Sequence, residues 1–139
     1  MTERGLPEGS ISGIDHVVLT VADVDAAAAF YNRVLGLQVE RFGAGRIALR
    51  FGRQKINLQS LGQEQRNHAT RGSGDLCLLT ELAPEVTLAA LQRAGVTVLE
   101  GPVPKTGAEG PITSVYFTDP DGNLIEISRY TKGGERMTT

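Results

Sequence analysis

The chain has 139 residues, the length of one domain with a core large enough to fold without disulfide bonds. Its net charge of −2 provides no basic field, so we expect neither a nucleic-acid nor a membrane partner. The single cysteine, Cys77, excludes an internal disulfide and a multi-cysteine zinc site. No apolar stretch has the length of a membrane span, and the first residues lack the apolar centre of a signal peptide. We therefore expect a cytoplasmic protein.

The predicted elements form two similar halves, because the segment 15–20 is echoed by the segment 75–80. In the first half we predict a strand over 14–21, a helix between Asp23 and Gly36, and strands over 37–42, 46–51 and 55–59. In the second half we predict a strand over 75–80, a helix between Pro84 and Gly95, and strands over 96–99, 113–118 and 123–128.

Each half is thus a βαβββ module, and the fold class is α+β. We place module one at 13–60, a polar linker at 61–74 and module two at 75–131, together one domain between tails at 1–12 and 132–139. The tail after Tyr130 is polar and glycine-rich, which is typical of a mobile segment. The seam between two such modules is a natural place for a pocket.

The segment 101–111 is rich in glycine and proline and longer than a simple connection requires. We predict a lid or binding loop there. Within it, Lys105 and Thr106 could hold an anionic group of a ligand, although an exposed turn explains them as well. The segment 119–122, Asp-Pro-Asp-Gly, is a strong turn signal.

Two polar residues interrupt apolar strands. His16 lies in an aliphatic segment, and Glu126 is flanked on both sides by apolar residues. A carboxylate in such a setting needs a partner, and a divalent metal ion would account for both residues. The alternative is a hydrogen-bonded core histidine and a glutamate that points to solvent. Cys77 also lies in an apolar run, which predicts a buried and unreactive thiol.

Alignment of the two halves suggests further site residues. Asn57 aligns with Glu126, and Gln59 shares its face of the strand, so either amide could bind metal or substrate. The residue equivalent to His16 depends on the alignment. Without a gap it is Leu76, which cannot bind a metal, and with a shift of one position it is Asp75, which can.

Three segments resemble the vicinal oxygen chelate superfamily, which includes glyoxalase I, fosfomycin- and bleomycin-resistance proteins and extradiol dioxygenases. The segments are 15–21, the pair Phe30-Tyr31 with Leu35-Gly36-Leu37, and 117–126. Within the superfamily, the segments 54–58 and 100–108 resemble the glyoxalase-domain-containing protein 5 group. The resemblance implies two βαβββ modules around a divalent metal, usually completed by homodimerisation.

Carried over by motif, the resemblance implies His16, Asp75 and Glu126 as metal ligands. The chain departs from glyoxalase I at Asn57, where that enzyme has a glutamate, because an amide cannot take up a proton. It also departs from the extradiol dioxygenases, since only one of these positions is a histidine. This oxygen-rich set favours hard ions, with Mn, Zn, Mg, Ni or Fe as the possible metals.

The resemblance therefore implies a metal-dependent, glyoxalase-like lyase or isomerase that acts on a small substrate chelated through neighbouring oxygens. In this interpretation Glu126 also moves a proton, while Lys105, Thr106, Asn57 and Gln59 contact the substrate. One alternative is a metal-free protein that sequesters a small molecule, as bleomycin-resistance proteins do. Another is a thiol transferase that modifies an antibiotic.

Overall fold

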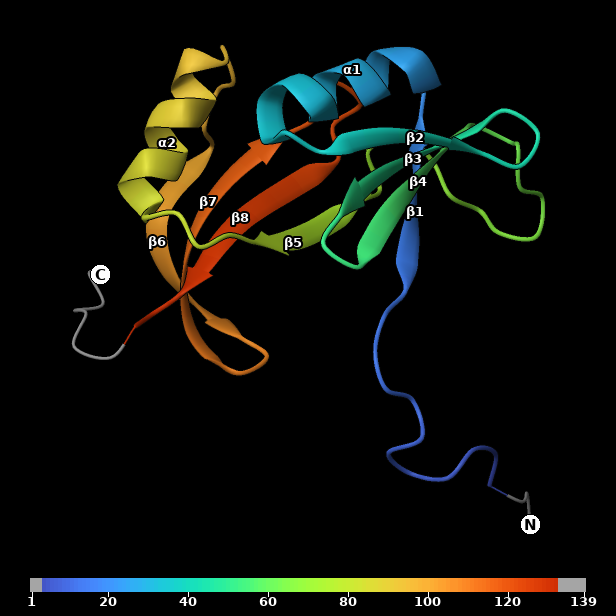
Figure 1. The fold of residues 1–139 in the computed structure, drawn as a ribbon, viewed down its shortest axis with the longest axis horizontal. Helices are drawn as coiled ribbons and strands as arrows, with labels where there is room; N and C mark the ends of the chain where they lie inside the picture. The colour runs from blue at the N-terminus through green and yellow to red at the C-terminus, as the bar shows by residue number, and fades with distance from the viewer. Residues whose placement is uncertain (1–3, 133–139) are drawn as a thin grey trace.

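The repeat in the sequence is also a repeat in space. The structure, a computed structural model, describes residues 4–132. Module one consists of β1 (His16–Val21), α1 (Val24–Leu35), β2 (Gln38–Phe42), β3 (Arg46–Phe51) and β4 (Gln54–Ser60). Module two consists of β5 (Asp75–Leu79), α2 (Pro84–Arg93), β6 (Glu100–Gly107), β7 (Gly110–Thr118) and β8 (Leu124–Tyr130). The α+β class and the paired βαβββ modules are confirmed (Figure 1).

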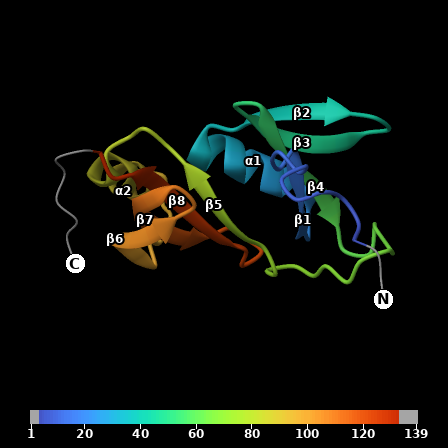
Figure 2. The same ribbon diagram turned by 90° about the horizontal axis from the view of Figure 1, so that it is seen from below.

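The strands form two separate four-stranded sheets with matching topology. Sheet A has the order β1-β4-β3-β2, and sheet B has the order β5-β8-β7-β6. In each sheet the first and last strands of the module pair in parallel and the other pairs are antiparallel. Both helices lie along the same side of the molecule, and Figure 2, from below, shows strands of sheet B in front of α2.

The predicted ends of α1 are confirmed. The side chain of Asp23 accepts a hydrogen bond from the backbone N–H of Ala26, as an N-cap residue does. Gly36 ends the helix in the left-handed conformation, at φ 69°, which glycine adopts without a steric penalty. Pro84 lies at the start of α2, where its missing N–H leaves no hydrogen bond unmade.

The prediction for 96–111 is wrong in part. The segment 96–99 is not a strand, although Val96 and Val98 pack against the core. The predicted loop 101–111 instead forms most of a hairpin, because β6 spans Glu100–Gly107 and β7 begins at Gly110. Proline is tolerated in β6 because this strand lies at the edge of sheet B, where only one side of the backbone is paired.

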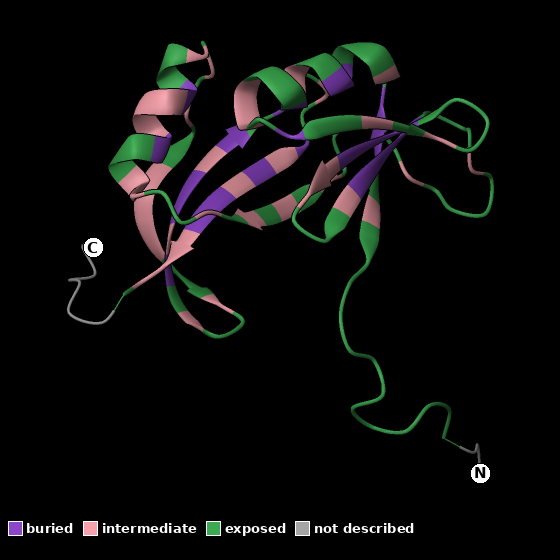
Figure 3. Ribbon diagram, viewed as in Figure 1, coloured by how far each residue is buried: buried purple, intermediate pink, exposed green. Residues whose placement is uncertain are grey.

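One core serves both modules. It lies between the sheets and the helices and includes Leu19, Leu49 and Ile56 of module one with Phe117 and Ile125 of module two. Along β5 and the first half of β8 more buried residues alternate with more exposed ones, whereas in β4 all of the segment 56–59 is buried (Figure 3). The core residues lie on the face toward the helices, and the opposite face of each sheet is the more polar one.

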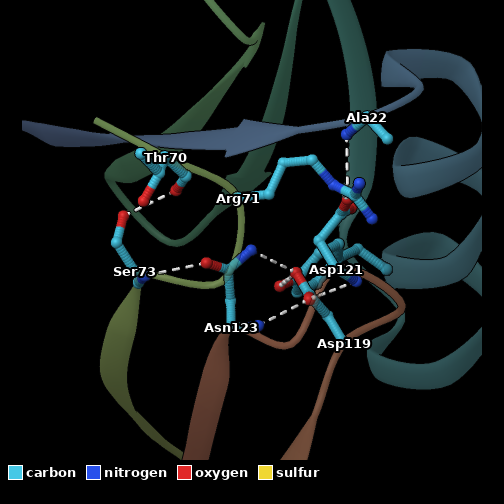
Figure 4. A network of polar contacts seen from close by, with 9 residues as sticks. Ala22, Thr70, Arg71, Ser73, Asp119, Asp121 and Asn123 are labelled. Carbon is cyan, nitrogen blue, oxygen red and sulfur yellow. Dashed lines mark hydrogen bonds and ion pairs between the residues drawn. The ribbon is translucent and has the colours of Figure 1, made fainter. Parts of the chain in front are cut away.

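A cluster of polar groups joins the modules at the turn between β7 and β8 (Figure 4). Asp119, which is 4% exposed, accepts a hydrogen bond of 2.7 Å from the phenol of Tyr31 on α1. It also accepts from the backbone and side-chain N–H groups of Asn123 at 2.9 Å. Burial and the hydrogen bond to Asp119 hold the pKa of Tyr31 well above its usual range.

The neighbouring carboxylate extends this cluster to the linker. Asp121 accepts hydrogen bonds from the backbone N–H of Ala22 at 2.8 Å and from the guanidinium of Arg71 at 2.9 Å. We call these residues the junction cluster: Ala22, Tyr31, Arg71, Asp119, Asp121 and Asn123. The predicted turn 119–122 is thus confirmed, and its acidic residues hold the modules and linker together.

The two predicted tails lie partly outside the residues that the structure describes. Residues 1–3 and 133–139, including most of the predicted mobile tail, lie outside the described residues. Residues 4–12 contain no helix or strand. Within residues 4–132 no helix is both long and apolar enough to cross a membrane.

Candidate functional site

Each sheet presents one face away from the helices, and the candidate residues lie on these two faces. The strand register shows which side chains lie on each face, because alternate residues of a strand share a face. Open face A contains His16, Val18, Thr20, Gln38, Glu40, Phe42, Arg46, Ala48, Arg50, Lys55, Asn57 and Gln59. Open face B includes Asp75, Cys77, Leu79, Glu100, Lys105, Ile112, Ser114, Tyr116, Glu126, Ser128 and Tyr130.

Strand pairing answers the alignment question that the sequence left open. In sheet A, Asn57 of β4 pairs with Val18, two residues after His16. In sheet B, Glu126 of β8 pairs with Cys77, two residues after Asp75. When Asn57 and Glu126 are superposed as equivalent, Asp75 therefore takes the place of His16. The shifted alignment is the structural one.

Glu126 is held in position by two serines of the same face. Its Oε2 accepts hydrogen bonds from the Ser114 hydroxyl at 2.6 Å and from the Ser128 hydroxyl at 3.2 Å. Both serines are fully buried, and their hydroxyls lie 2.7 Å apart. Both serine contacts are made to Oε2, so they orient the half-buried carboxylate and leave its Oε1 free of the two serines.

A phenol lies close to this carboxylate, and an ammonium lies near the phenol. Tyr116 pairs with Glu126 in the β7–β8 register, and partial burial, followed by hydrogen bonding and the charge of Glu126, raises the pKa of Tyr116 to about 12. The Lys105 ammonium lies 5.6 Å from the centre of the Tyr116 ring and 3.6 Å from Glu100. The sequence did not point to Tyr116, because its proximity depends on cross-strand pairing ten residues away.

A cavity of about 350 Å³ adjoins Glu126 on open face B. Its lining includes Thr106 and the apolar side chains of Leu79, Ile112 and Tyr130. Thr106 and Glu126 therefore line the same cavity. Lys105, by contrast, does not line this cavity and is engaged with Glu100 and Tyr116.

The prediction for Cys77 is wrong in one respect. The residue is exposed, because its side chain lies on open face B instead of the core face. Partial desolvation, together with the nearby charges of Glu126 and Asp75, raises the pKa of the thiol despite a hydrogen bond to Ser128. A raised pKa keeps the thiol protonated, which agrees with the predicted low reactivity.

The two amides of open face A differ from each other. Gln59 is 8% exposed and donates a hydrogen bond of 2.9 Å to the Thr20 hydroxyl, so its amide is committed to structure. Asn57 is 3% exposed, and its Oδ1 is buried with no hydrogen-bond partner among the described residues. A buried oxygen of this kind is costly and marks a position where a ligand could supply the missing contact.

His16 lies at the exposed start of β1. Its Nδ1 is 2.9 Å from the carboxylate of Asp15, and this hydrogen bond, with the charge of His16, lowers the pKa of Asp15. A neighbouring carboxylate orients the ring and leaves Nε2 for another partner. His16 lines a cavity of about 410 Å³ that also includes Cys77 and Lys55.

The predicted ligands do not meet within one chain. Glu126 and His16 line different cavities, and Asp75 lines neither of them. Among residues 4–132, no three His, Cys, Asp or Glu side chains lie close enough together to hold one metal ion. Each donor is nevertheless on an open face, and Glu126 and His16 are oriented by neighbours. Their chemistry suits a divalent ion, but one chain does not bring enough donors together.

Comparison with known proteins gives one consistent result. The family model described as Glyoxalase/Bleomycin resistance protein/Dioxygenase superfamily matches residues 13–127. Virulence protein STM3117 of Salmonella typhimurium is 47% identical over 123 residues, 86% of this chain and 85% of that protein. The structure of an integron cassette protein from the mobile metagenome of V. cholerae matches with a TM-score of 0.83 and 52% identity, covering 88% of this chain and 98% of that one. Metallothiol transferase FosB of Shouchella clausii is 28% identical over 125 residues, 84% of this chain and 80% of that protein.

Proposed function

Because the chain belongs to the glyoxalase/bleomycin resistance protein/dioxygenase superfamily, we propose that it is a divalent-metal-dependent enzyme of the lyase or isomerase type. Its substrate would be a small molecule with neighbouring oxygens. The observation that carries this proposal is the orientation of Glu126, whose Oε2 is fixed by Ser114 and Ser128 on an open face. A relative that is named a metallothiol transferase supports metal dependence.

The metal site would be completed by a second copy of the chain. Glu126 and His16 are each oriented on an exposed face, yet one chain does not bring them to a common point. Pairing of open face B with open face A of a partner would add His16 to the donor set that contains Glu126 and Asp75. Exposed apolar residues on both faces, Val18 at 41% and Leu79 at 63%, favour such pairing.

The residues of the chain have distinct roles in this proposal. Glu126, His16 and Asp75 would hold the ion, which supplies stabilisation of an enolate or oxyanion when it is bound. Glu126 would also move a proton of the substrate, accepting it from carbon and returning it. Tyr116, whose phenol is protonated at neutral pH, would donate a hydrogen bond to a substrate oxygen.

Metal content tests the proposal. Elemental mass spectrometry of the purified protein should find a stoichiometric divalent metal in the wild type and little in Glu126→Gln. Glu109→Gln is the matched control, because Glu109 is an exposed residue of the β6–β7 turn. A wild type that is metal-free and takes up none of Mn²⁺, Zn²⁺, Mg²⁺, Ni²⁺ or Fe²⁺ would refute it.

A second candidate is metal-free sequestration of a small molecule. The cavity beside Glu126 favours it, because Leu79, Ile112 and Tyr130 give that cavity an apolar lining. In this case His16→Ala would leave ligand affinity unchanged.

A further inference from the structure

Three buried side-chain oxygens of the described residues have no hydrogen-bond partner, those of Asn57, Thr87 and Thr131, and that of Asn57 is the one on open face A. Its residue is 3% exposed, and Oδ1 has no hydrogen-bond donor among residues 4–132. On the same face the Gln59 side chain donates a hydrogen bond from Nε2 to the Thr20 hydroxyl. An amide oxygen accepts hydrogen bonds, so the group that is missing is an O–H or N–H donor.

A positively charged side chain crosses the sheet beside this oxygen. Lys55 lies on β4, two residues before Asn57, and its ammonium is 3.7 Å from the centre of the Phe42 ring on β2. Since β3 lies between these strands, the contact runs diagonally above Ala48, the β3 residue that pairs with Asn57. Ala48 is fully buried, and its small side chain leaves room for the contact between Lys55 and Phe42.

The Lys55 ammonium acts on carboxylates only from a distance: its charge adds to the hydrogen bonds of His16 and Arg50 that lower the pKa of Asp15 and of Glu40. No carboxylate of the described residues lies within ion-pair distance of its ammonium, whereas the neighbouring Arg50 is paired with Glu40. Arg46 adds a second cation, with its guanidinium carbon 4.7 Å from the centre of the same Phe42 ring. A contact between an ammonium and an aromatic face is weaker than an ion pair with a carboxylate, so an anion would draw Lys55 away from Phe42.

We propose that Lys55 and Asn57 form a subsite for a hydroxy acid. Lys55 binds the carboxylate, Arg46 adds positive charge, and Asn57 Oδ1 accepts a hydrogen bond from the hydroxyl. Residues two apart on a strand are separated by roughly 6–7 Å, and the flexible lysine spans the rest. Movement of Lys55 from Phe42 uncovers the region above Ala48 and Asn57. This inference rests on the proposed function in that it names a substrate class for the same enzyme, but binding at Lys55 and Asn57 does not itself require the metal.

The test compares three small acids and amides on the full-length protein. Lactate carries both groups, propionate lacks the hydroxyl, and lactamide lacks the charge. Chemical-shift titration of ¹⁵N-labelled protein should show lactate binding about fivefold or more tightly than either analogue, with shifts at Lys55 and Asn57. In Lys55→Met the affinity for lactate should fall to the affinity for lactamide. In Asn57→Leu the affinity for lactate should fall to the affinity for propionate. Arg93→Met, which removes a charge from α2, should change neither comparison.

Equal binding of the three compounds by the wild type, or no binding, would overturn the inference. This outcome needs only the wild-type protein. A lactate preference that survives both substitutions would also overturn it. The titration is repeated in EDTA to separate the inference from the proposed function. A preference that disappears with EDTA would place the ligand on the metal and refute the subsite, while supporting metal dependence. A preference that persists in EDTA supports the subsite whatever the metal content.

Discussion

The junction cluster and the open faces contain similar kinds of polar residue, but the two regions differ in how completely these residues are hydrogen-bonded. In the junction cluster each oxygen of Asp119 is hydrogen-bonded, and Asp121 is held by a backbone N–H and a guanidinium. On the open faces Asn57 Oδ1 has no donor among the described residues, and Glu126 is supported on Oε2 alone by its two serines. Satisfied buried groups stabilise a fold, whereas an unsatisfied buried group needs an explanation, and a ligand that is not in the structure is one.

The largest effect is expected from Asp119→Ala. The substitution removes the acceptor for the Tyr31 phenol and leaves that buried hydroxyl without a partner. We expect a loss of about 3–5 kcal/mol in the free energy of unfolding, measured by urea denaturation. Glu109→Gln should leave the free energy unchanged. A loss of less than 1 kcal/mol for Asp119→Ala would contradict a structural role for the cluster.

Gly72→Ala tests the close contact between the linker and the same turn. Gly72 has φ +79°, and an added Cβ would lie 2.9 Å from the backbone oxygen of Asp121. Strain at this backbone conformation and the close approach should together cost about 1–3 kcal/mol. Gly62→Ala is the control, because its φ is +80° but no atom lies within 4 Å of the added Cβ. Equal destabilisation of the two variants would show that φ alone matters.

Ser114→Ala should separate stability from metal affinity. The variant loses one hydrogen bond to Glu126 Oε2, which should cost about 1 kcal/mol of stability. Because the hydroxyl orients a proposed metal ligand, we expect metal affinity to fall about tenfold or more. Competition with a chelator measures this fall. Unchanged affinity with the same loss of stability would make Ser114 a packing residue only.

The pKa of Tyr116 tests its contact with Glu126. Removal of the carboxylate charge in Glu126→Gln should lower this pKa from about 12 toward the ordinary value of 10, and partial burial should retain some of the shift. The titration is followed by NMR of labelled tyrosine. A Tyr116 pKa that stays at about 12 would assign the shift to burial and to charges other than that of Glu126, such as Glu100.

The same pKa has a consequence for stability. A pKa raised in the folded state means that the folded protein holds its proton more tightly than the unfolded chain does. The stabilisation from Tyr116 is therefore complete below pH 10 and is lost as the pH rises through about 12. The free energy of unfolding should fall over this interval less steeply in Glu126→Gln. Equal slopes would contradict the coupling.

Local patterns in the sequence predicted most of the fold. The caps of α1, the start of α2 and the turn at 119–122 depend on residues close together in the chain, and all three are as predicted. The strand β6 was missed because Pro102 and Pro104 disfavour a strand, and only its place at the sheet edge makes them acceptable. Whether a strand lies at the edge or in the centre depends on the whole sheet, so a short segment of sequence cannot show it.

The candidate site, like the fold, was predictable only where the signal lies in a local segment of sequence. Glu126 and His16 stood out because polar residues are rare in apolar strands. The equivalence of Asp75 and His16 required the β5–β8 register, which two alignments of the sequence could not decide. The serines that hold Glu126 lie on β7 and β8, and ordinary serines in strands carry no signal of such a role.

Complementation between two inactive variants tests most directly whether the open faces of two copies form one metal site. His16→Ala and Glu126→Ala should each abolish stoichiometric metal binding. After unfolding and refolding of a 1:1 mixture, half of the dimers are mixed, and each contains one intact site. The account therefore predicts metal at about one quarter of the wild-type content. A mixture as metal-free as the separate variants would contradict a site shared between copies.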